Sequence, residues 1–320
     1  MASASKSNLK SSLAALVFLV GGVFAPSFLS GQTTRVLVSA PSKSLTWFPA
    51  VVAREKGFYR AEGLDVDFVI MKPQLAMQAV ITGDVSYTTA LGSTVRAALR
   101  GIPARVVMTI CDRPQFALVV KPGIRSVADL RGKLIGISSF GASTDTLARA
   151  LLQKHKLVPG QDVKILAVGG GTNRLAALKS GAVDAALMEL PYNVMLESEG
   201  FHRLLFIGDL FPSPIAGLGT TLERIRKKAD EVRRMVRATL RGIQYAKSRS
   251  DESVRLITKW MDINASLAEA SYGMAVKTWS DSGAAGPEGV QVAIEEAKRE
   301  LKLDSLPDAS QAFDWTFVVR

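Results

Sequence analysis

A run of small hydroxylated residues and glycines lies between an apolar segment and a helical pattern near the middle of the chain. Residues 134–137 predict a short buried strand, and residues 144–152 carry apolar side chains at helical spacing. A helix N-terminus approached through small residues presents unpaired N–H groups and a positive dipole end to an anion. The pattern is consistent with an anion site and also with a simple helix cap at Ser143 or Thr144. The hydroxylated residues of this stretch are Ser138, Ser139, Ser143 and Thr144.

Other reactive residue types are scarce. Gly136 and Gly141 have the spacing of a nucleotide loop, but no Gly-Lys-Ser/Thr follows, so the pattern excludes that loop. Cys111 is the single cysteine and follows an apolar run, which favours a buried structural thiol over a nucleophile. The two histidines, His155 and His202, fall within or after helical segments. We therefore predict no catalytic residue, metal site or cofactor.

The composition is that of an ordinary globular protein with a basic surface. The 320 residues are 48% hydrophobic and 22% charged, and the formal charge is +11. Lysines and arginines are spread along the chain, which favours a solvated basic surface over a nucleic-acid interface. The basic helical segment 223–249 has an apolar face and is interpreted as a helix with a solvated outer face rather than as a membrane or nucleic-acid contact.

The N-terminus has the three-part pattern of a secretory signal peptide. Lys6 and Lys10 precede an apolar run over residues 13–24, and Ala25-Pro-Ser27 follows with small residues at the cleavage spacing. The apolar run is short for a membrane span, although an uncleaved anchor is the alternative. No cysteine is available for lipid attachment, so we predict a periplasmic protein released by cleavage, with residues 1–30 as the signal peptide.

The elements after the signal peptide predict a parallel sheet flanked by helices. Residues 35–39 read as a strand, 40–49 as a polar loop with the aromatic Trp47, 50–56 as a helix, and 64–70 as a strand. Strand, helix and strand in this order are typical of an α/β fold.

A helix–glycine–strand unit occurs twice, 98 positions apart. Residues 75–90 contain a helix, Gly83 and a strand expected from Val85, and residues 175–188 contain a helix, Gly181 and a strand expected from Val183. Two copies at this distance indicate two similar lobes. The units lead into loops expected at residues 91–94 and 189–192, which should face a shared cleft because ligands sit beyond the carboxyl ends of parallel strands.

Further elements follow the same plan. Residues 115–120 are expected to form a strand leaving the first lobe, and 126–130 to open the second. The glycine-rich residues 169–173 predict a loop before a helix near Arg174, and residues 206–221, rich in glycine and proline, are expected to return to the first lobe. The C-terminal part is expected to be helical, in the segments 223–249, 251–261, 266–277 and 289–302.

Four motifs resemble a known family. FPAVVAREKGFYRAEGLDV at 48–66, GDV at 83–85, VADLRGKLIG at 127–136 and GAVD at 181–184 resemble landmarks of the periplasmic substrate-binding proteins of ABC transporters. The subgroup is the one that binds nitrate, taurine and aliphatic sulfonates, also called thiamine-pyrimidine-precursor-like. The resemblance covers residues 35–300, and the cysteine-rich motif of the pyrimidine-forming members is absent.

The resemblance implies an α/β type 2 periplasmic binding fold. It has two lobes, each a mainly parallel sheet flanked by helices, with the ligand cleft between them. The first lobe would contain residues 31–117 and 213–320, and the inserted second lobe residues 118–212. The family's solute contacts map onto Trp47, Gln74, Leu91, Gly92, Ser93, Ser138, Ser139, Ser143, Thr144, Asn173, Arg174 and Glu189. Glu189 is expected to pair with Arg174 or to meet an amine of the solute.

The leading function hypothesis is therefore a non-enzymatic receptor. It would bind an anionic or zwitterionic organic solute, resembling a sulfonate, taurine or nitrate, and deliver it as a monomer to an ABC permease, with no nucleic-acid partner. One alternative is a desulfinase-like enzyme with Cys111 as nucleophile, although no paired base is visible. The other alternative is a receptor that signals to a sensor protein.

The signal peptide generates the first testable prediction. The exported protein should begin near Phe28, because the small residues before it suit signal peptidase. Intact-mass spectrometry of the exported protein should show loss of about the first 25 to 31 residues. A mass that retains Met1 would contradict this prediction.

Overall fold

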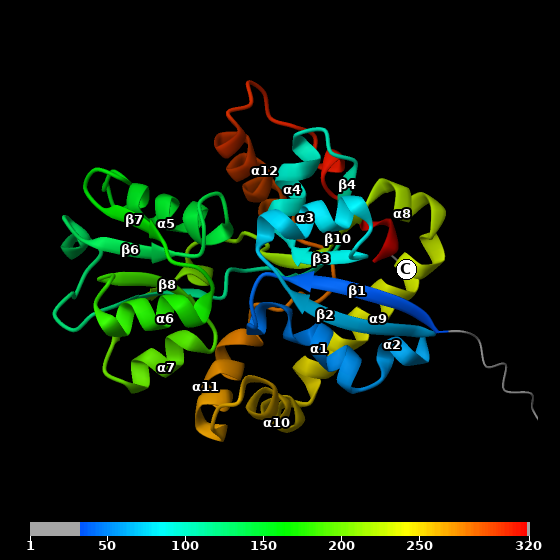
Figure 1. Ribbon diagram of the computed structural model, residues 1–320, viewed down its shortest axis with the longest axis horizontal. Helices are drawn as coiled ribbons and strands as arrows, with labels where there is room; N and C mark the ends of the chain where they lie inside the picture. Colours follow the sequence, from blue (N-terminus) through cyan, green and yellow to red (C-terminus); the bar gives the residue numbers. More distant parts are fainter. Residues whose placement is uncertain (1–32, 319–320) are drawn as a thin grey trace, which may run out of the picture. The chain divides into compact units, whose positions relative to one another are not determined.

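Two five-stranded sheets organise the chain. The computed structural model describes residues 33–318, so the predicted signal peptide lies outside the described residues. We call the parts built on the two sheets lobe 1 and lobe 2 (Figure 1). The sheet of lobe 1 contains β1 (Thr34–Ala40), β2 (Leu64–Ile70), β3 (Tyr87–Ala90), β4 (Ala104–Cys111) and β10 (Ala216–Thr221). The sheet of lobe 2 contains β5 (Phe116–Val120), β6 (Leu134–Ile137), β7 (Lys164–Ala167), β8 (Ala185–Glu189) and β9 (His202–Phe206).

Both sheets have the same pairing scheme. The strand orders are β2-β1-β3-β10-β4 and β7-β6-β8-β5-β9. In each sheet the first three strands are parallel, and the fourth pairs antiparallel with both of its neighbours. The chain crosses between the sheets after β4 and again before β10. The fold is therefore the two-lobed α/β fold expected, although the two antiparallel strands make each sheet mixed.

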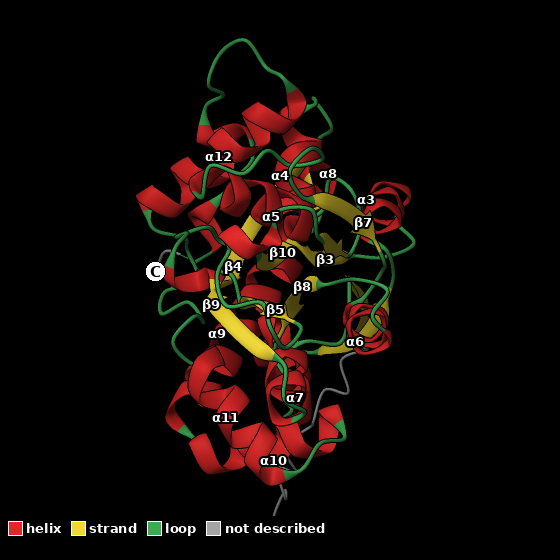
Figure 2. Ribbon diagram, turned by 90° about the vertical axis from the view of Figure 1, so that its left-hand side faces the viewer, coloured by secondary structure: helices red, strands yellow, loops and turns green. Residues whose placement is uncertain are grey.

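Helices cover both sheets. Lobe 2 carries α5 (Ser143–Lys154), α6 (Gly171–Ser180) and α7 (Tyr192–Ser198). The helices of lobe 1 are α1 (Phe48–Glu55), α2 (Phe58–Ala61), α3 (Pro73–Thr82), α4 (Leu91–Leu99), α8 (Leu222–Lys227), α9 (Ala229–Ser248), α10 (Ser250–Met261), α11 (Ala265–Ala275) and α12 (Pro287–Leu301). Figure 2 shows the strands enclosed by these helices. Among the described residues, no helix is long and apolar enough to span a membrane.

The repeated unit forms the same turn in both lobes. Gly83 and Gly181 end α3 and α6 with φ of 86° and 81°, which glycine adopts without strain. The N–H groups of Val85 and Val183 then donate back to the carbonyl six residues earlier, at 3.1 and 3.3 Å. This bond holds the valines in the turn. The strands therefore begin two residues later than predicted, at Tyr87 and Ala185.

The loop predicted at 91–94 is wrong, and the loop predicted at 169–173 ends earlier than expected. Residues 91–94 form the first turn of α4, directly after β3, and α6 already begins at Gly171. The chain therefore passes from a strand end into a helix with few or no loop residues between them. This places helix N-termini at the carboxyl ends of the strands, where the sequence predicted flexible loops.

The segment 206–221 returns to lobe 1 as expected, and it contains a strand, β10, that was not predicted. A Cβ atom on Gly217 would lie 2.2 Å from the Met108 carbonyl oxygen, and one on Gly219 would lie 2.2 Å from Thr94 Oγ1. The glycines of this segment therefore allow a central strand to approach β4 and α4 closely. The predicted helix 223–249 is likewise two helices, α8 and α9, which meet at Lys228 (φ −132°).

The contact between α1 and α9 depends on a glycine and generates a stability prediction. A Cβ on Gly242 would lie 2.3 Å from the Pro49 carbonyl oxygen and 2.8 Å from Ala53 Cβ. Gly242→Ala should therefore lower the free energy of unfolding by about 1–3 kcal/mol through overpacking.

The matched control is Gly273→Ala in α11, where an added Cβ meets nothing within 4 Å. This variant should gain about 0.5–1 kcal/mol, because alanine loses less backbone entropy in a helix. Urea unfolding of both variants makes the comparison. Equal stabilities for the two variants would contradict the packing described for α1 and α9.

Candidate ligand-binding site

A cavity of about 450 Å³ is lined by residues of both lobes. It lies at the carboxyl ends of the parallel strands. β1, β3, β6, β7 and β8 all end at residues that line the cavity or directly precede lining residues. In open parallel sheets this edge is where ligands bind, because the strand–helix connections leave a crevice there. The cavity is therefore the candidate ligand site of this fold.

Three helix N-termini meet at this cavity. The N-cap residues of α4, α5 and α6 are Ala90, Ala142 and Gly170, and all three line it. None of the three caps has a side chain that accepts a hydrogen bond from the first turn. The first-turn N–H groups and the positive ends of three helix dipoles therefore favour a negatively charged group in the cavity.

The loop between β6 and α5 is held by its own hydroxyls. The Ser138 N–H donates to Thr144 Oγ1 at 2.9 Å, and the two hydroxyls lie 2.7 Å apart. The Gly141 N–H donates to Asp145 Oδ2 at 3.0 Å. The expected strand, polar loop and helix are present, but the cap predicted at Ser143 or Thr144 is wrong. Ala142 is the N-cap, Thr144 bonds to Ser138, and the Ser143 side chain lines the cavity.

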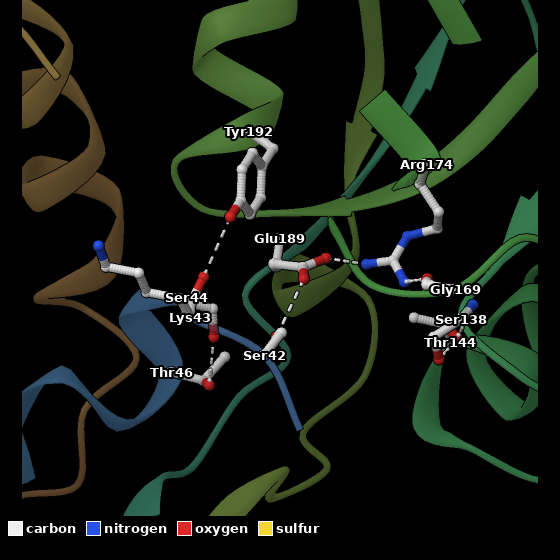
Figure 3. Close-up of polar contacts among 10 residues, drawn as sticks. All are labelled: Ser42, Lys43, Ser44, Thr46, Ser138, Thr144, Gly169, Arg174, Glu189 and Tyr192. Atoms are coloured by element: carbon white, nitrogen blue, oxygen red, sulfur yellow. Dashed lines mark hydrogen bonds and ion pairs between the residues drawn. The ribbon is translucent and has the colours of Figure 1, made fainter. Parts of the chain in front are cut away.

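Arg174 and Glu189 form a buried ion pair at the wall of the cavity (Figure 3). Their side chains are 2% and 3% exposed. Arg174 also donates to the Gly169 carbonyl at 2.8 Å, and Glu189 accepts from the Ser42 hydroxyl of lobe 1 at 3.2 Å. The pairing expected for Glu189 is confirmed. Arg174 is therefore not a free cation, because its charge is matched within the wall.

The loop at residues 41–46 of lobe 1 contacts lobe 2 at three points. Besides the Ser42–Glu189 bond, the Tyr192 hydroxyl donates to the Lys43 carbonyl at 3.4 Å (Figure 3). The Leu45 N–H donates to the Leu190 carbonyl at 3.3 Å. Burial and the nearby Glu189 charge raise the pKa of Tyr192, so its hydroxyl stays protonated as a donor. These bonds hold the two lobes together along one side of the cavity.

Nine of the expected site residues line the cavity. They are Gly92, Ser93, Ser138, Ser139, Ser143, Thr144, Asn173, Arg174 and Glu189. Asn173 and Arg174 lie in the first turn of α6 rather than in a loop. Gln74 lies in the first turn of α3, and its side chain lies outside the described part of the structure. Whether the nine contact a solute remains a prediction.

Two expected residues do not line the cavity. Trp47 is 2% exposed, and its ring packs 4.9 Å from Phe68 and 5.1 Å from Trp260, measured between centroids. Its Nε1–H donates to the Ser42 carbonyl at 2.8 Å, so Trp47 supports the 41–46 loop from the core instead of stacking on a solute. Leu91, the first residue of α4, is fully buried in the core of lobe 1.

The sequence reasoning missed several lining residues. Ser42, Ser44 and Thr46 follow β1, and Lys72 precedes α3. The signal for the three hydroxyls was present, because they follow a strand end just as Ser138 and Ser139 do. The aromatic residue in the same loop was chosen instead. Phe116 lies where the chain enters lobe 2, and no motif marks it.

Cys111 lies outside the cavity and is expected to be unreactive. It is fully buried, its Sγ donates to the Arg113 carbonyl at 3.1 Å, and burial raises its pKa to about 12. Neither histidine lines the cavity. Within residues 33–318, no group of three or more His, Cys, Asp and Glu side chains could hold a metal ion. The arrangement suits non-covalent binding rather than nucleophilic chemistry.

Comparison with known sequences gives matches over most of the chain. The family model described as NMT1/THI5 like matches residues 46–253. The riboflavin-binding protein RibY of Chloroflexus aurantiacus is 30% identical over 236 residues, which cover 70% of this chain and 65% of the relative. The match therefore spans less than two thirds of that relative's length.

Solved structures share the fold at low sequence identity. The alkanesulfonate-binding protein SsuA from Xanthomonas axonopodis pv. citri, bound to MOPS, has a TM-score of 0.74 at 17% identity and covers 90% of this chain and 100% of that one. The periplasmic nitrate-binding protein NrtA from Synechocystis PCC 6803 has a TM-score of 0.70 at 12% identity, covering 88% and 86%. These likenesses confirm the two-lobed fold.

The thiol of Cys111 provides a test of chemical inertness. A pKa of about 12 leaves almost no thiolate at pH 8, and the buried sulfur is shielded from reagents. Ellman's reagent should therefore label the native protein only slowly and label the urea-unfolded protein at once. Rapid labelling of the native protein would contradict the structural role of Cys111.

The buried ion pair provides a test of stability. Arg174→Met leaves the Glu189 carboxylate buried without its cation and should cost about 3–5 kcal/mol of unfolding free energy. The double variant Arg174→Met with Glu189→Met should recover most of that loss, because no charge then remains buried. Urea unfolding measures both. A single variant as stable as the parent would show that the pair does not form.

Proposed function

Because the chain belongs to the NMT1/THI5-like family, we propose that it is an extracytoplasmic solute receptor of an ABC importer. It captures a small anionic or zwitterionic organic solute between its lobes and delivers it to a membrane permease. The observation that carries the proposal is the convergence of three uncapped helix N-termini on one cavity between the lobes.

The energetics of the cavity support an anionic end on the solute. Each helix N-terminus contributes about 0.3–1 kcal/mol to anion binding, and up to about 2 kcal/mol when partly buried. Micromolar affinity needs about 8 kcal/mol in total. The helix ends and the cavity hydroxyls therefore have to act together. Lys72 is exposed at the cavity and has no ion pair within the described chain, so it adds a favourable charge.

The rest of the cavity favours a compact polar solute. Phe116 is the aromatic side chain among the described lining residues, so a large flat ring system would lack a second ring to enclose it. Glu189 keeps unused acceptor capacity for an amine, because a carboxylate accepts more bonds than the two it makes here. We therefore favour a sulfonate-, taurine- or nitrate-like solute over a flavin like that of the relative RibY.

The proposed mechanism is hinge closure. The crossings after β4 and before β10 supply the hinge, and the bonds from the 41–46 loop to lobe 2 belong to the closed arrangement. A solute that touches both lobes stabilises this arrangement by its differential affinity. We propose lobe boundaries near 117/118 and 212/213, a monomeric protein in the periplasm, an ABC permease as partner, and no nucleic-acid partner.

Two alternatives remain as competing proposals. An enzyme on this fold would need a reactive group at the cavity, and the buried Cys111 lies elsewhere. A receptor that signals to a sensor protein would use the same solute site. A permease and an ATPase gene beside the receptor gene would favour the importer.

A solute screen followed by one substitution tests the proposal. Thermal-shift assays with sulfonates, taurine, nitrate and aromatic carboxylates should reveal solutes that raise the melting temperature by mass action. For a solute found in this way, Ser139→Ala should weaken binding by about 0.5–3 kcal/mol in calorimetric titration, because a polar partner is lost.

Ser305→Ala is the matched control, since Ser305 is exposed and does not line the cavity. It should bind the solute as tightly as the parent protein. If Ser139→Ala also binds with unchanged affinity, the Ser139 side chain does not contact the solute.

A further inference from the structure

A second cavity of about 800 Å³ lies between α3, α4, α5 and α12. Ser93 is the one described residue that it shares with the solute cavity. Figures 1 and 2 show α4, α5 and α12 on the same side of the molecule. Its volume is within the range of small-molecule sites, which span about 300–1,000 Å³.

The charges that line this cavity are mainly positive. The five cations are Arg96, Arg100, Arg149, Arg299 and Lys302, and the three carboxylates are Asp145, Glu296 and Glu300. Two of the cations are neutralised, because Arg96 lies 3.3 Å from Glu300 and Arg149 lies 2.7 Å from Asp145. The remaining three cations form no ion pair within residues 33–318. The cavity therefore presents unmatched positive charge.

Glu296 does not cancel this excess at neutral pH. Burial, the main cause, raises the pKa of Glu296 to about 7, and the nearby Glu300 charge also raises it. The Ser213 hydroxyl, which donates to Oε2 at 3.2 Å, lowers the pKa, as do the charges of Arg299 and Arg96. Near pH 7 the group is therefore about half protonated. The net charge of the lining rises from +2 towards +3 as the pH falls.

An apolar surface completes the cavity. Ile81 of α3 is 41% exposed, and Phe140, in the loop before α5, is 55% exposed. Both line the cavity, one from each lobe, together with the buried Met77. Exposed apolar side chains beside unmatched arginines suit a ligand with an apolar body and anionic groups.

We propose that this cavity is a second ligand site, which takes an organic dianion with an aromatic or aliphatic body. Arg100 and Arg299 bind its anionic groups, since guanidinium forks match the oxygens of sulfonate, phosphate or carboxylate. Ile81 and Phe140 contact its body. The site does not depend on the solute proposed for the first cavity.

The probe for the test is naphthalene-1,5-disulfonate, whose two charges do not change between pH 6 and 8. Calorimetric titration should show binding that the double variant Arg100→Gln with Arg299→Gln weakens at least tenfold. The control is Arg125→Gln with Arg226→Gln, which removes the same charge from exposed positions outside the cavity and should leave the affinity within twofold of the parent. Equal losses in the two double variants would overturn the site and indicate general charge attraction.

Two further measurements separate this site from the solute cavity. Ser139→Ala should leave the affinity for the probe unchanged. If Ser139→Ala weakens probe binding and the Arg100/Arg299 double variant does not, the probe binds in the first cavity and the proposal is overturned. The affinity for the probe should rise as the pH falls from 8 to 6, because Glu296 gains a proton. Glu296→Gln should remove most of that rise. If the protein does not bind the probe at all, the proposal is also overturned.

Discussion

The buried Arg174–Glu189 ion pair is the interaction on which the solute cavity depends. Two desolvated charges need each other and further hydrogen bonds to offset the cost of burial. Here those contacts come from α6, β8, the Gly169 carbonyl and, across the cleft, Ser42 of lobe 1, while the Arg174 Nε–H has no hydrogen-bond partner among the described residues. The pair therefore fixes the wall of lobe 2 and gives Ser42 of lobe 1 a polar partner across the cleft. Because the charge of Arg174 is matched by Glu189, the proposed binding of an anion depends on the helix N-termini and on the exposed Lys72.

Close backbone approach makes this arrangement possible. A Cβ on Gly171 would lie 2.4 Å from Tyr192 and 2.7 Å from Glu189 Oε1, so only glycine lets the first turn of α6 reach the ion pair. The same constraint acts in lobe 1, where Gly217 and Gly219 allow β10 to pack between β3 and β4. The glycines of this chain therefore mark close contacts between elements as well as turns.

The sequence predicts the fold well and the site in part. Apolar periodicity and the repeated helix–glycine–strand unit locate most strands and helices, because local patterns determine them. β10 was missed because its glycines reflect tertiary packing, which no local pattern encodes. The predicted strand at 134–137, the hydroxylated residues after it and the helical pattern at 144–152 located the lobe 2 side of the cavity. Trp47 was misplaced, because an aromatic residue in a polar loop reads the same whether it faces a solute or, as here, the core against Phe68 and Trp260.

The central claim is that the N-termini of α4, α5 and α6 bind the anionic end of a solute. The most direct measurement is a crystal structure of the protein with 2-bromoethanesulfonate, in which anomalous scattering locates the bromine. We expect sulfonate oxygens within hydrogen-bond distance of the first-turn N–H groups of these helices, with the bromine pointing away from them. A cavity without sulfonate, or a ligand with its bromine against the helix ends, would contradict it.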